Sequence, residues 1–201
     1  FIGLSAYWEI PAQEKTAVKG KWVEARGEEF LGAFLEKHPG FPLIAEDLGS
    51  VTPAVRKLME KFGLPGMKVL LFAFSGDSAN PYLPHNHLPH CILYTGTHDN
   101  NTARGWFEED ATEEEKKNFC RYLGREVGPD EVPGEMIRLA MMSVAETAIL
   151  PVQDLLGLGS EGRMNTPSTQ EGNWKWKLLP GQITPDRGER LRELTETYGR
   201  A

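Results

Sequence analysis

Two apolar runs of the chain each end on acidic side chains, and these acids are the first candidates for chemistry. Glu46 and Asp47 follow one run, and His98 and Asp99 follow another. In parallel α/β folds, ligands lie at the carboxyl ends of the strands, so residues in these positions are expected to face a common site. One carboxylate can stay protonated as a general acid while another stays ionised beside developing positive charge. Glycoside chemistry needs that division of roles.

Each acidic pair also has a purely structural interpretation. Glu46 and Asp47 precede a helix start, where the helix macrodipole favours acids. His98 and Asp99 are equally consistent with a hydrogen-bonded turn. The neighbouring Asn100-Asn101 pair adds polar groups that suit a hydroxyl-rich ligand.

A third polar stretch, "RMNTP" at residues 163–167, follows the last apolar run at some distance. The segment from there to "GNWKW" at 172–176 has no helical period. It is typical either of an ordered loop that carries ligand contacts or of a packed C-terminal strap. Aromatic side chains that could stack on sugar rings, or simply pack, are Tyr7, Trp8, Phe72, Trp106, Trp174 and Trp176.

The elements expected to position these residues alternate between buried strands and amphipathic helices. Strands are predicted at 41–45, 67–74, 91–95 and, less clearly because of Pro151, at 149–152. Helices are predicted from the Thr52-Pro53 start to Gly63, from the Thr112/Glu115 capping box to Gly124, over 133–148, and from Thr184-Pro185 onward. This alternation predicts an α/β fold with a parallel sheet, open or closed.

Composition narrows the classes of protein and partner. The chain has 201 residues, 40% of them hydrophobic, and a net charge of −7, which argues against a nucleic-acid partner. It has no apolar run of roughly 18 residues and no signal peptide, so we expect no membrane partner and a cytoplasmic location. No linker or repeat divides it, and a single unit over 1–201 is expected. Because its first residue is Phe1 rather than methionine, the chain is expected to be a fragment.

Neither a metal nor a cofactor is predicted. Two cysteines provide no disulfide framework and no metal knuckle. Three histidines in "PHNHLPH", His85, His87 and His90, suggest zinc, but a nearby cysteine and an HExxH pattern are both lacking. Surface-loop histidines are the better interpretation.

Six collinear stretches carry a family resemblance: "AYWEIP", "AEDLG", "GLPGMKVL", "YTGTHDNNT", "PVQDLLGLGSEGRMNTP" and "GNWKW". Together they closely resemble the carboxy-terminal half of amylomaltases, which are bacterial 4-α-glucanotransferases (disproportionating enzymes) of the α-amylase superfamily. The resemblance covers essentially the whole chain. It implies a (β/α)8 TIM-type barrel, of which this chain would supply the last four strands plus helical insertions, with no separate second domain.

The same resemblance implies roles for individual residues. Glu46 corresponds to the acid/base of a retaining mechanism, Asp99 to the carboxylate that steadies the transition state, and His98 to a sugar-binding residue. Asp47, Phe72 and Asn165 resemble positions that line the sugar subsites. The implied partners are malto-oligosaccharides and other α-glucans.

Three departures from the family pattern matter. The family's nucleophilic aspartate lies in an "RIDH" motif immediately before the position of Phe1, so the missing N-terminal half would supply it and the chain alone is expected to be inactive. Ile2 stands where arginine is expected, and Asn101 where aspartate is common. Two alternatives remain open: an α-glucan hydrolase of the same superfamily, and a non-catalytic carbohydrate-binding fragment.

Overall fold

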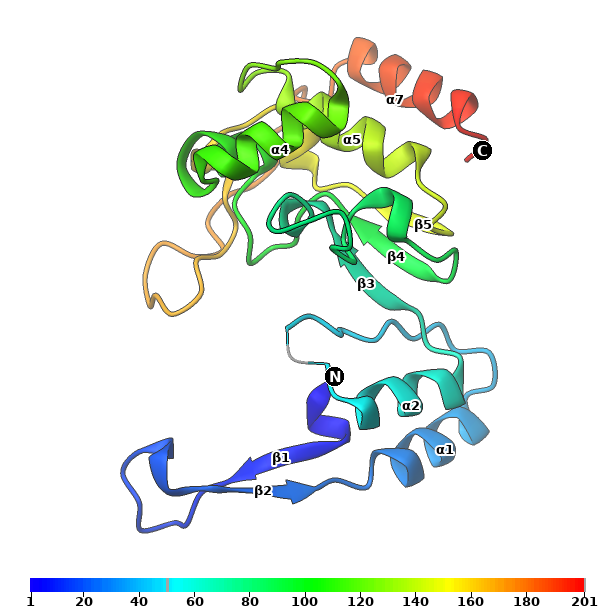
Figure 1. Cartoon of the computed structure of the whole chain (residues 1–201), viewed down its shortest axis with the longest axis vertical. Helices are drawn as coiled ribbons and strands as arrows, with labels where there is room; N and C mark the ends of the chain where they lie inside the picture. The colour runs from blue at the N-terminus through cyan, green and yellow to red at the C-terminus, as the bar shows by residue number, and fades with distance from the viewer. Residues whose placement is uncertain (50, 201) are drawn as a thin grey trace. The chain divides into compact units, whose positions relative to one another are not determined.

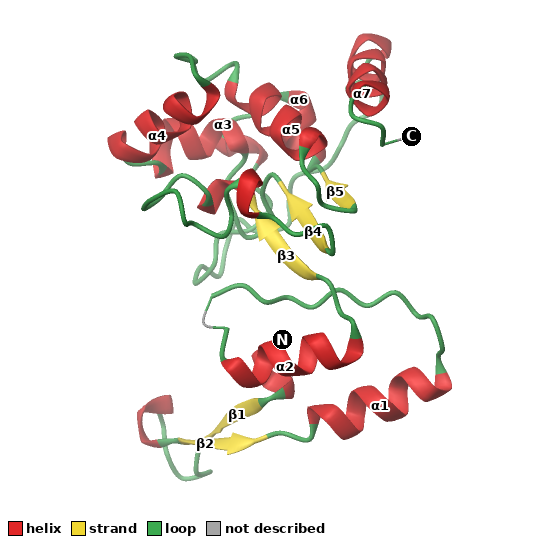
Figure 2. Cartoon of the chain, turned by 45° about the vertical axis from the view of Figure 1, so that its right-hand side comes forward, coloured by secondary structure: helices red, strands yellow, loops and turns green. Residues whose placement is uncertain are grey.

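The computed structural model describes residues 1–49 and 51–200, which form two compact units (Figure 1). Unit 1 is Phe1–Met67, and unit 2 begins at Lys68. Figure 2 shows that strands and helices occur in both. None of the described helices is long and apolar enough to cross a membrane.

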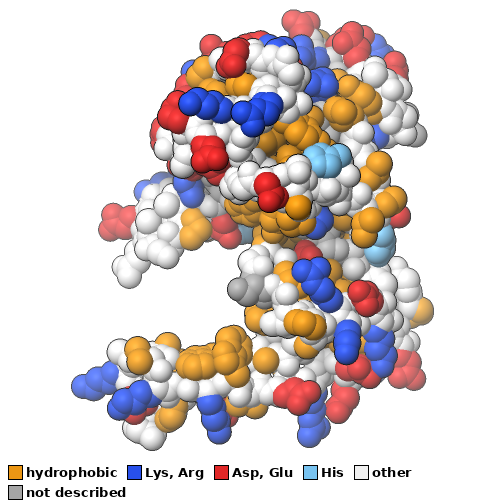
Figure 3. Space-filling view, in the orientation of Figure 1, with side chains coloured by type: hydrophobic (Ala, Val, Ile, Leu, Met, Phe, Trp, Pro, Cys, Tyr) orange, Lys and Arg blue, Asp and Glu red, His pale blue; other side chains and the backbone are white. Residues whose placement is uncertain are grey.

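Unit 1 combines a hairpin with two helices. Strands β1 (Ala6–Glu9) and β2 (Lys21–Glu24) pair antiparallel, with Trp8 opposite Trp22. The sequence patterns did not predict this hairpin. Figure 3 shows hydrophobic side chains gathered over it. The remaining elements are the 3₁₀ turns Ile2–Leu4 and Ala17–Lys19 and the helices α1 (Gly27–Lys37) and α2 (Pro53–Phe62).

Helix α2 confirms the prediction made from its end signals. The Thr52 hydroxyl accepts a hydrogen bond from the Val55 amide (3.3 Å), Pro53 occupies the first turn, and Gly63 ends the helix in the left-handed region at φ 59°. Its apolar side chains pack against a small core made of Leu31, Ala45, Leu58 and Leu64, with Met59 and Phe62 at its edge.

The predicted strand at 41–45 is wrong. These residues have no strand or helix assignment, and Phe41 and Ile44 are 52% and 48% exposed. A strand needs a ladder of hydrogen bonds to a neighbouring strand, whereas the Ala45 amide donates to the carbonyl of Pro65 (2.9 Å), a residue outside any strand. Ala45, at 1% exposed, enters the core, and the partly buried Leu43 packs against it.

Unit 2 is built on a three-stranded sheet in the order β3-β4-β5. Strands β4 (Cys91–Tyr94) and β5 (Thr147–Ile149) are parallel, and β3 (Gly66–Val69) begins in the last residues of unit 1. The helices are α3 (Ala103–Gly105), which continues as a π-helical turn (Trp106–Asp110), α4 (Glu113–Leu123), α5 (Val132–Met142), α6 (Val152–Leu156) and α7 (Pro185–Thr197). Short 3₁₀ turns lie at Leu70–Phe72, Pro84–Asn86 and Ser160–Gly162.

Most predicted elements of unit 2 are confirmed, with shifted ends. Both halves of the Thr112/Glu115 capping box form, and Gly124 ends α4 at φ 75°. Strand β3 is shorter than predicted because the chain tightens into a 3₁₀ turn after Val69. Helix α5 stops at Met142 rather than 148, since Ser143 is already extended, and β5 therefore comes two residues earlier than predicted.

The core of unit 2 contains a cluster of aromatic side chains. Phe119 of α4 is fully buried and contacts the rings of Phe74, Trp106 and Phe107 at centroid distances of 4.8 to 6.2 Å. These contacts hold α3 and α4 together, and hence fix the end of the loop that follows β4. That loop carries His98 and Asp99.

Candidate active site

The loop between β4 and α3 presents His98 and Asp99 at its tip. Within it, the Asn100 side-chain oxygen accepts hydrogen bonds from both the backbone amide and the hydroxyl of Thr97 (2.9 Å each). At its end, the Thr102 hydroxyl caps α3 by accepting from the Gly105 amide (3.0 Å). The hydrogen-bonded turn that was the alternative interpretation of His98 and Asp99 is therefore present. Both side chains are exposed on this turn.

Asp99 is the centre of a polar cluster. Its Oδ1 accepts a hydrogen bond from Asn165 Nδ2 (2.6 Å) and lies 3.4 Å from His98 Nε2. The backbone amide of Asn165 donates to the His98 carbonyl (3.1 Å), and Arg163 Nη2 donates to the Asp99 carbonyl (3.0 Å). The structure thus brings together three predicted site residues from distant parts of the sequence, with His98 and Asp99 about half exposed.

A buried carboxylate, Asp154, holds both ends of the His98-Asp99 loop. Its two oxygens accept hydrogen bonds from the Thr95 hydroxyl (2.5 Å) at the end of β4 and from the Ala103 amide (2.7 Å) at the start of α3. Asp154 is 3% exposed. Burial raises the pKa of its carboxyl, and the two hydrogen bonds oppose that shift.

Sequence reasoning missed this residue. Asp154 lies in the "PVQDLLGL" stretch, which contributed to the resemblance but received no role. The sequence did contain a signal for it: Asp154 is an acid within an otherwise apolar stretch. A buried charge there would be costly unless it had hydrogen-bond partners.

Two further residues border the polar cluster. Arg163 belongs to the predicted "RMNTP" stretch and donates from Nε to the Asn165 carbonyl (3.0 Å). Trp174 belongs to "GNWKW", and its ring lies 5.2 Å from the His98 ring between centroids. Both line a cavity of about 190 Å³ with His98 and Asn100. The sequence marked both stretches, but only Asn165 was assigned a role there.

Glu46 and Asp47 belong to unit 1. The Glu46 side chain is exposed, and its backbone carbonyl accepts a hydrogen bond from the Phe1 nitrogen (2.8 Å). Asp47 is partly buried, and its Oδ1 accepts from the Met67 amide (2.6 Å). A Cβ at position 66 would lie 2.6 Å from the Asp47 carboxylate, so Gly66 is what permits this approach. Asp47 braces the first residues of β3.

Phe72 follows β3 and lines a second opening in unit 2. Its ring meets Tyr82 edge to face at 5.4 Å, and both border an open cavity of about 630 Å³. The Phe72 carbonyl accepts a hydrogen bond from Asn80 Nδ2 (2.8 Å), which orders the loop after it. A backbone bond from Leu71 to the Thr95 carbonyl (3.2 Å) links this region to the end of β4.

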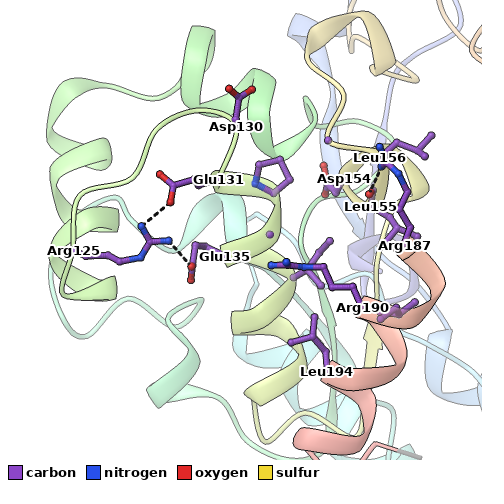
Figure 4. A pocket seen from close by; sticks show the side chains of 15 residues that line it. Arg125, Asp130, Glu131, Glu135, Asp154, Leu155, Leu156, Arg187, Arg190 and Leu194 are labelled. Atoms are coloured by element: carbon purple, nitrogen blue, oxygen red, sulfur yellow. Dashed lines mark hydrogen bonds and ion pairs between the residues drawn. The ribbon is translucent and has the colours of Figure 1, made fainter. Parts of the chain in front are cut away.

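Another cavity, of about 370 Å³, lies among α5, α6 and α7 and contains none of the predicted site residues (Figure 4). Arg125 pairs there with Glu131 and Glu135 (2.8 Å each), and Arg187 donates to the Leu155 carbonyl (2.7 Å). These charges are satisfied by their neighbours.

The histidines considered as zinc ligands contact residues outside the polar cluster. His85 bonds to the Tyr122 hydroxyl (3.2 Å) and the Ser78 carbonyl (3.1 Å), and His87 bonds to the Tyr82 carbonyl (2.9 Å). Burial lowers the pKa of His87. Among residues 1–49 and 51–200, no three His, Cys, Asp or Glu side chains are placed to hold a metal ion.

The two departures that lie within the chain, Asn101 and Ile2, occupy different settings. Asn101 is 5% exposed, and its Nδ2 donates to the Ser160 hydroxyl (3.0 Å). This bond links the loop after β4 to the 3₁₀ turn at Ser160–Gly162. Ile2 is 38% exposed in the first 3₁₀ turn. Neither side chain replaces one of the predicted catalytic groups.

Comparison with known proteins shows which family the chain resembles. The sequence model of a family described as 4-α-glucanotransferase matches residues 1–182. The 4-α-glucanotransferase of Thermus thermophilus is 50% identical over 208 aligned residues, which cover 100% of this chain and 41% of the relative. That of a Synechocystis species is 47% identical over 203 residues, covering 100% of this chain and 40% of the relative.

A solved structure matches as well. An amylomaltase from Streptococcus agalactiae, determined in complex with acarbose, superposes with a TM-score of 0.89 at 37% identity, covering 99% of this chain and 40% of that one. The chain thus spans about 40% of the length of these relatives. On the match over residues 1–182, this chain belongs to the 4-α-glucanotransferase family.

Proposed function

We propose that the protein containing this chain transfers α-1,4-glucan segments between malto-oligosaccharides or starch chains. The observation that carries this proposal is the match to glucanotransferases along residues 1–182, which include every predicted site residue. The hydrogen-bonded cluster of His98, Asp99 and Asn165 supports it, because a carboxylate fixed at the mouth of a sheet suits a positively charged transition state.

The proposed reaction is a retaining double displacement. Glu46 donates a proton to the glycosidic oxygen while an aspartate attacks the anomeric carbon, so the acceptor-side sugar leaves and a covalent glycosyl-enzyme forms. Glu46 then takes the proton from the 4-hydroxyl of an incoming sugar as that oxygen displaces the aspartate. Asp99 stabilises the oxocarbenium-like charge in both steps, and His98 donates a hydrogen bond to the sugar.

The attacking aspartate is proposed to precede Phe1 in the complete protein. The family resemblance supports this, because the family's "RIDH" motif lies immediately before the position of Phe1. We therefore expect the chain by itself to lack transferase activity. In the complete protein it would form, as one domain over 1–201, the last four strands of a (β/α)8 barrel.

Other assignments follow from the family. Asp47, Phe72 and Asn165 are proposed to line sugar subsites, in addition to the bracing contacts described above. Malto-oligosaccharides and α-glucans are the proposed partners, the cytoplasm is the proposed location, and the chemistry needs only carboxylates and hydrogen bonds.

The direct test uses the complete protein, maltotriose and separation of the products. Wild type should form both glucose and longer oligosaccharides, with little rise in reducing ends. Glu46→Gln should reduce turnover by about 10²–10⁴-fold, because the proton source is lost, while maltotriose affinity stays within about threefold. Full turnover in that variant would refute the assignment of Glu46. A steady rise in reducing ends with wild type would instead indicate a hydrolase.

A further inference from the structure

Trp174 combines an unfavourable backbone conformation with an exposed side chain. Its φ of 59° lies in the left-handed region. Among the described non-glycine residues, Ser168 is the only other one with a positive φ. An L-residue with a bulky side chain pays for that conformation in steric strain, and glycine would not. The indole is nevertheless 59% exposed, so the strain does not serve core packing. By contrast, Trp106 of the aromatic core is 6% exposed.

The surrounding loop fixes this conformation. The Trp174 amide donates to the Met164 carbonyl at 2.7 Å, which ties the end of the loop to its beginning. Next to it, the Asn173 side chain accepts from the Thr166 amide (2.9 Å) and donates to the Thr169 carbonyl (3.2 Å). The indole is therefore presented by a loop that is closed by its own hydrogen bonds.

The indole forms one wall of the cavity beside the polar cluster. Its plane is tilted by 37° from that of His98, at 5.2 Å between ring centroids. Polar groups of Thr97, Asn100 and Arg163 line the same cavity. Its volume of about 190 Å³ is below the about 300–1,000 Å³ of pockets for drug-sized ligands, so it suits one ring rather than a whole oligosaccharide.

We propose that Trp174 is the stacking platform for one glucose ring of the α-glucan, beside His98, and that it sets the affinity for that sugar. A pyranose has an apolar C–H face that packs on an aromatic ring, and hydroxyls at its rim that need polar partners. Trp174 supplies the first, and Asn100 and Arg163 supply the second. The inference rests on the proposed function for the identity of the sugar.

The test compares Trp174 with its near neighbour Trp176, which is partly buried and does not line the cavity. In the complete protein, Trp174→Ala should raise both the maltotriose Kd, measured by calorimetry, and the KM by about three- to tenfold, with kcat changed less. Trp174→Phe should restore part of the affinity. Trp176→Ala should leave the maltotriose Kd within about twofold of wild type.

Trp174→Gly separates sugar binding from folding. Because glycine adopts the left-handed conformation without strain, its Tm should equal or exceed that of Trp174→Ala, while its maltotriose affinity should fall just as far. Equal Kd values for wild type, Trp174→Ala and Trp174→Gly would overturn the inference. If wild type binds maltotriose but transfers no glucan, the proposed function fails while the Kd comparison still decides the role of Trp174.

Discussion

At the scale of residues, Asp154 holds the loop of the candidate site in place, although the sequence analysis assigned it no role. It joins the end of β4 to the start of α3 through Thr95 and Ala103, and so sets the span of the loop carrying His98 and Asp99. Local sequence could mark the polar residues after β4, because their type and position follow from the strand pattern. It could not reveal a partner 59 residues away from Thr95.

Replacing Asp154 should therefore destabilise the protein and disturb the loop. In Asp154→Ala, a buried hydroxyl and a buried amide lose their acceptor, and each such loss costs about 1–3 kcal/mol, so we expect the free energy of unfolding to fall by about 2–6 kcal/mol. Asp154→Asn keeps one acceptor oxygen and should lose less. Glu171→Ala, on the exposed loop, is the control and should change stability by less than about 0.5 kcal/mol. Denaturant unfolding measures all three.

The pH dependence of the free energy of unfolding provides a second test of Asp154. Its pKa is raised on folding, so the folded state binds a proton more tightly than the unfolded state does. The contribution to stability is present below the unfolded pKa and is lost as pH rises through the folded pKa. Asp154→Asn should remove that pH-dependent loss. An Asp154→Asn variant with the same pH profile of stability as wild type would contradict this assignment.

At the scale of elements, local signals predicted helices better than strands. Cap residues act within one turn, so Thr52, Thr112 and Gly124 mark helix ends correctly. A strand depends on a partner elsewhere in the chain, and the apolar run at 41–45 has the composition of a strand without the ladder. The β1–β2 hairpin shows the opposite case, in which paired strands form from a segment that the apolar pattern did not mark.

Two helix starts provide a matched test of this cap argument. Thr112 forms a complete capping box, whereas Thr184 occupies the same position before α7 and makes no side-chain cap bond. Thr112→Ala should lower the free energy of unfolding by about 1 kcal/mol, within the 0.5–2 kcal/mol typical of caps. Thr184→Ala should lower it by no more than about 0.3 kcal/mol. Equal losses in denaturant unfolding would show that the cap bond at Thr112 contributes nothing.

At the scale of the whole molecule, the predicted carboxylates are divided between the two compact units. Glu46 lies in unit 1 and Asp99 in unit 2, and each is positioned by contacts within its own unit. That the two carboxylates act together is our proposal from the family resemblance, and composition and periodicity did not predict it. The relatives are about two and a half times longer than this chain, and our proposal places the attacking aspartate in the part of the protein that this chain does not include.

The most direct measurement of the central claim is a crystal structure of the complete protein with acarbose bound. We expect the carboxyl groups of Glu46 and Asp99 to lie within about 3 Å of atoms of adjoining sugar rings at a single cleavage point, together with an aspartate from the segment before Phe1. Acarbose bound with either carboxyl group facing away from it, more than about 10 Å from the cleavage point, would contradict the account.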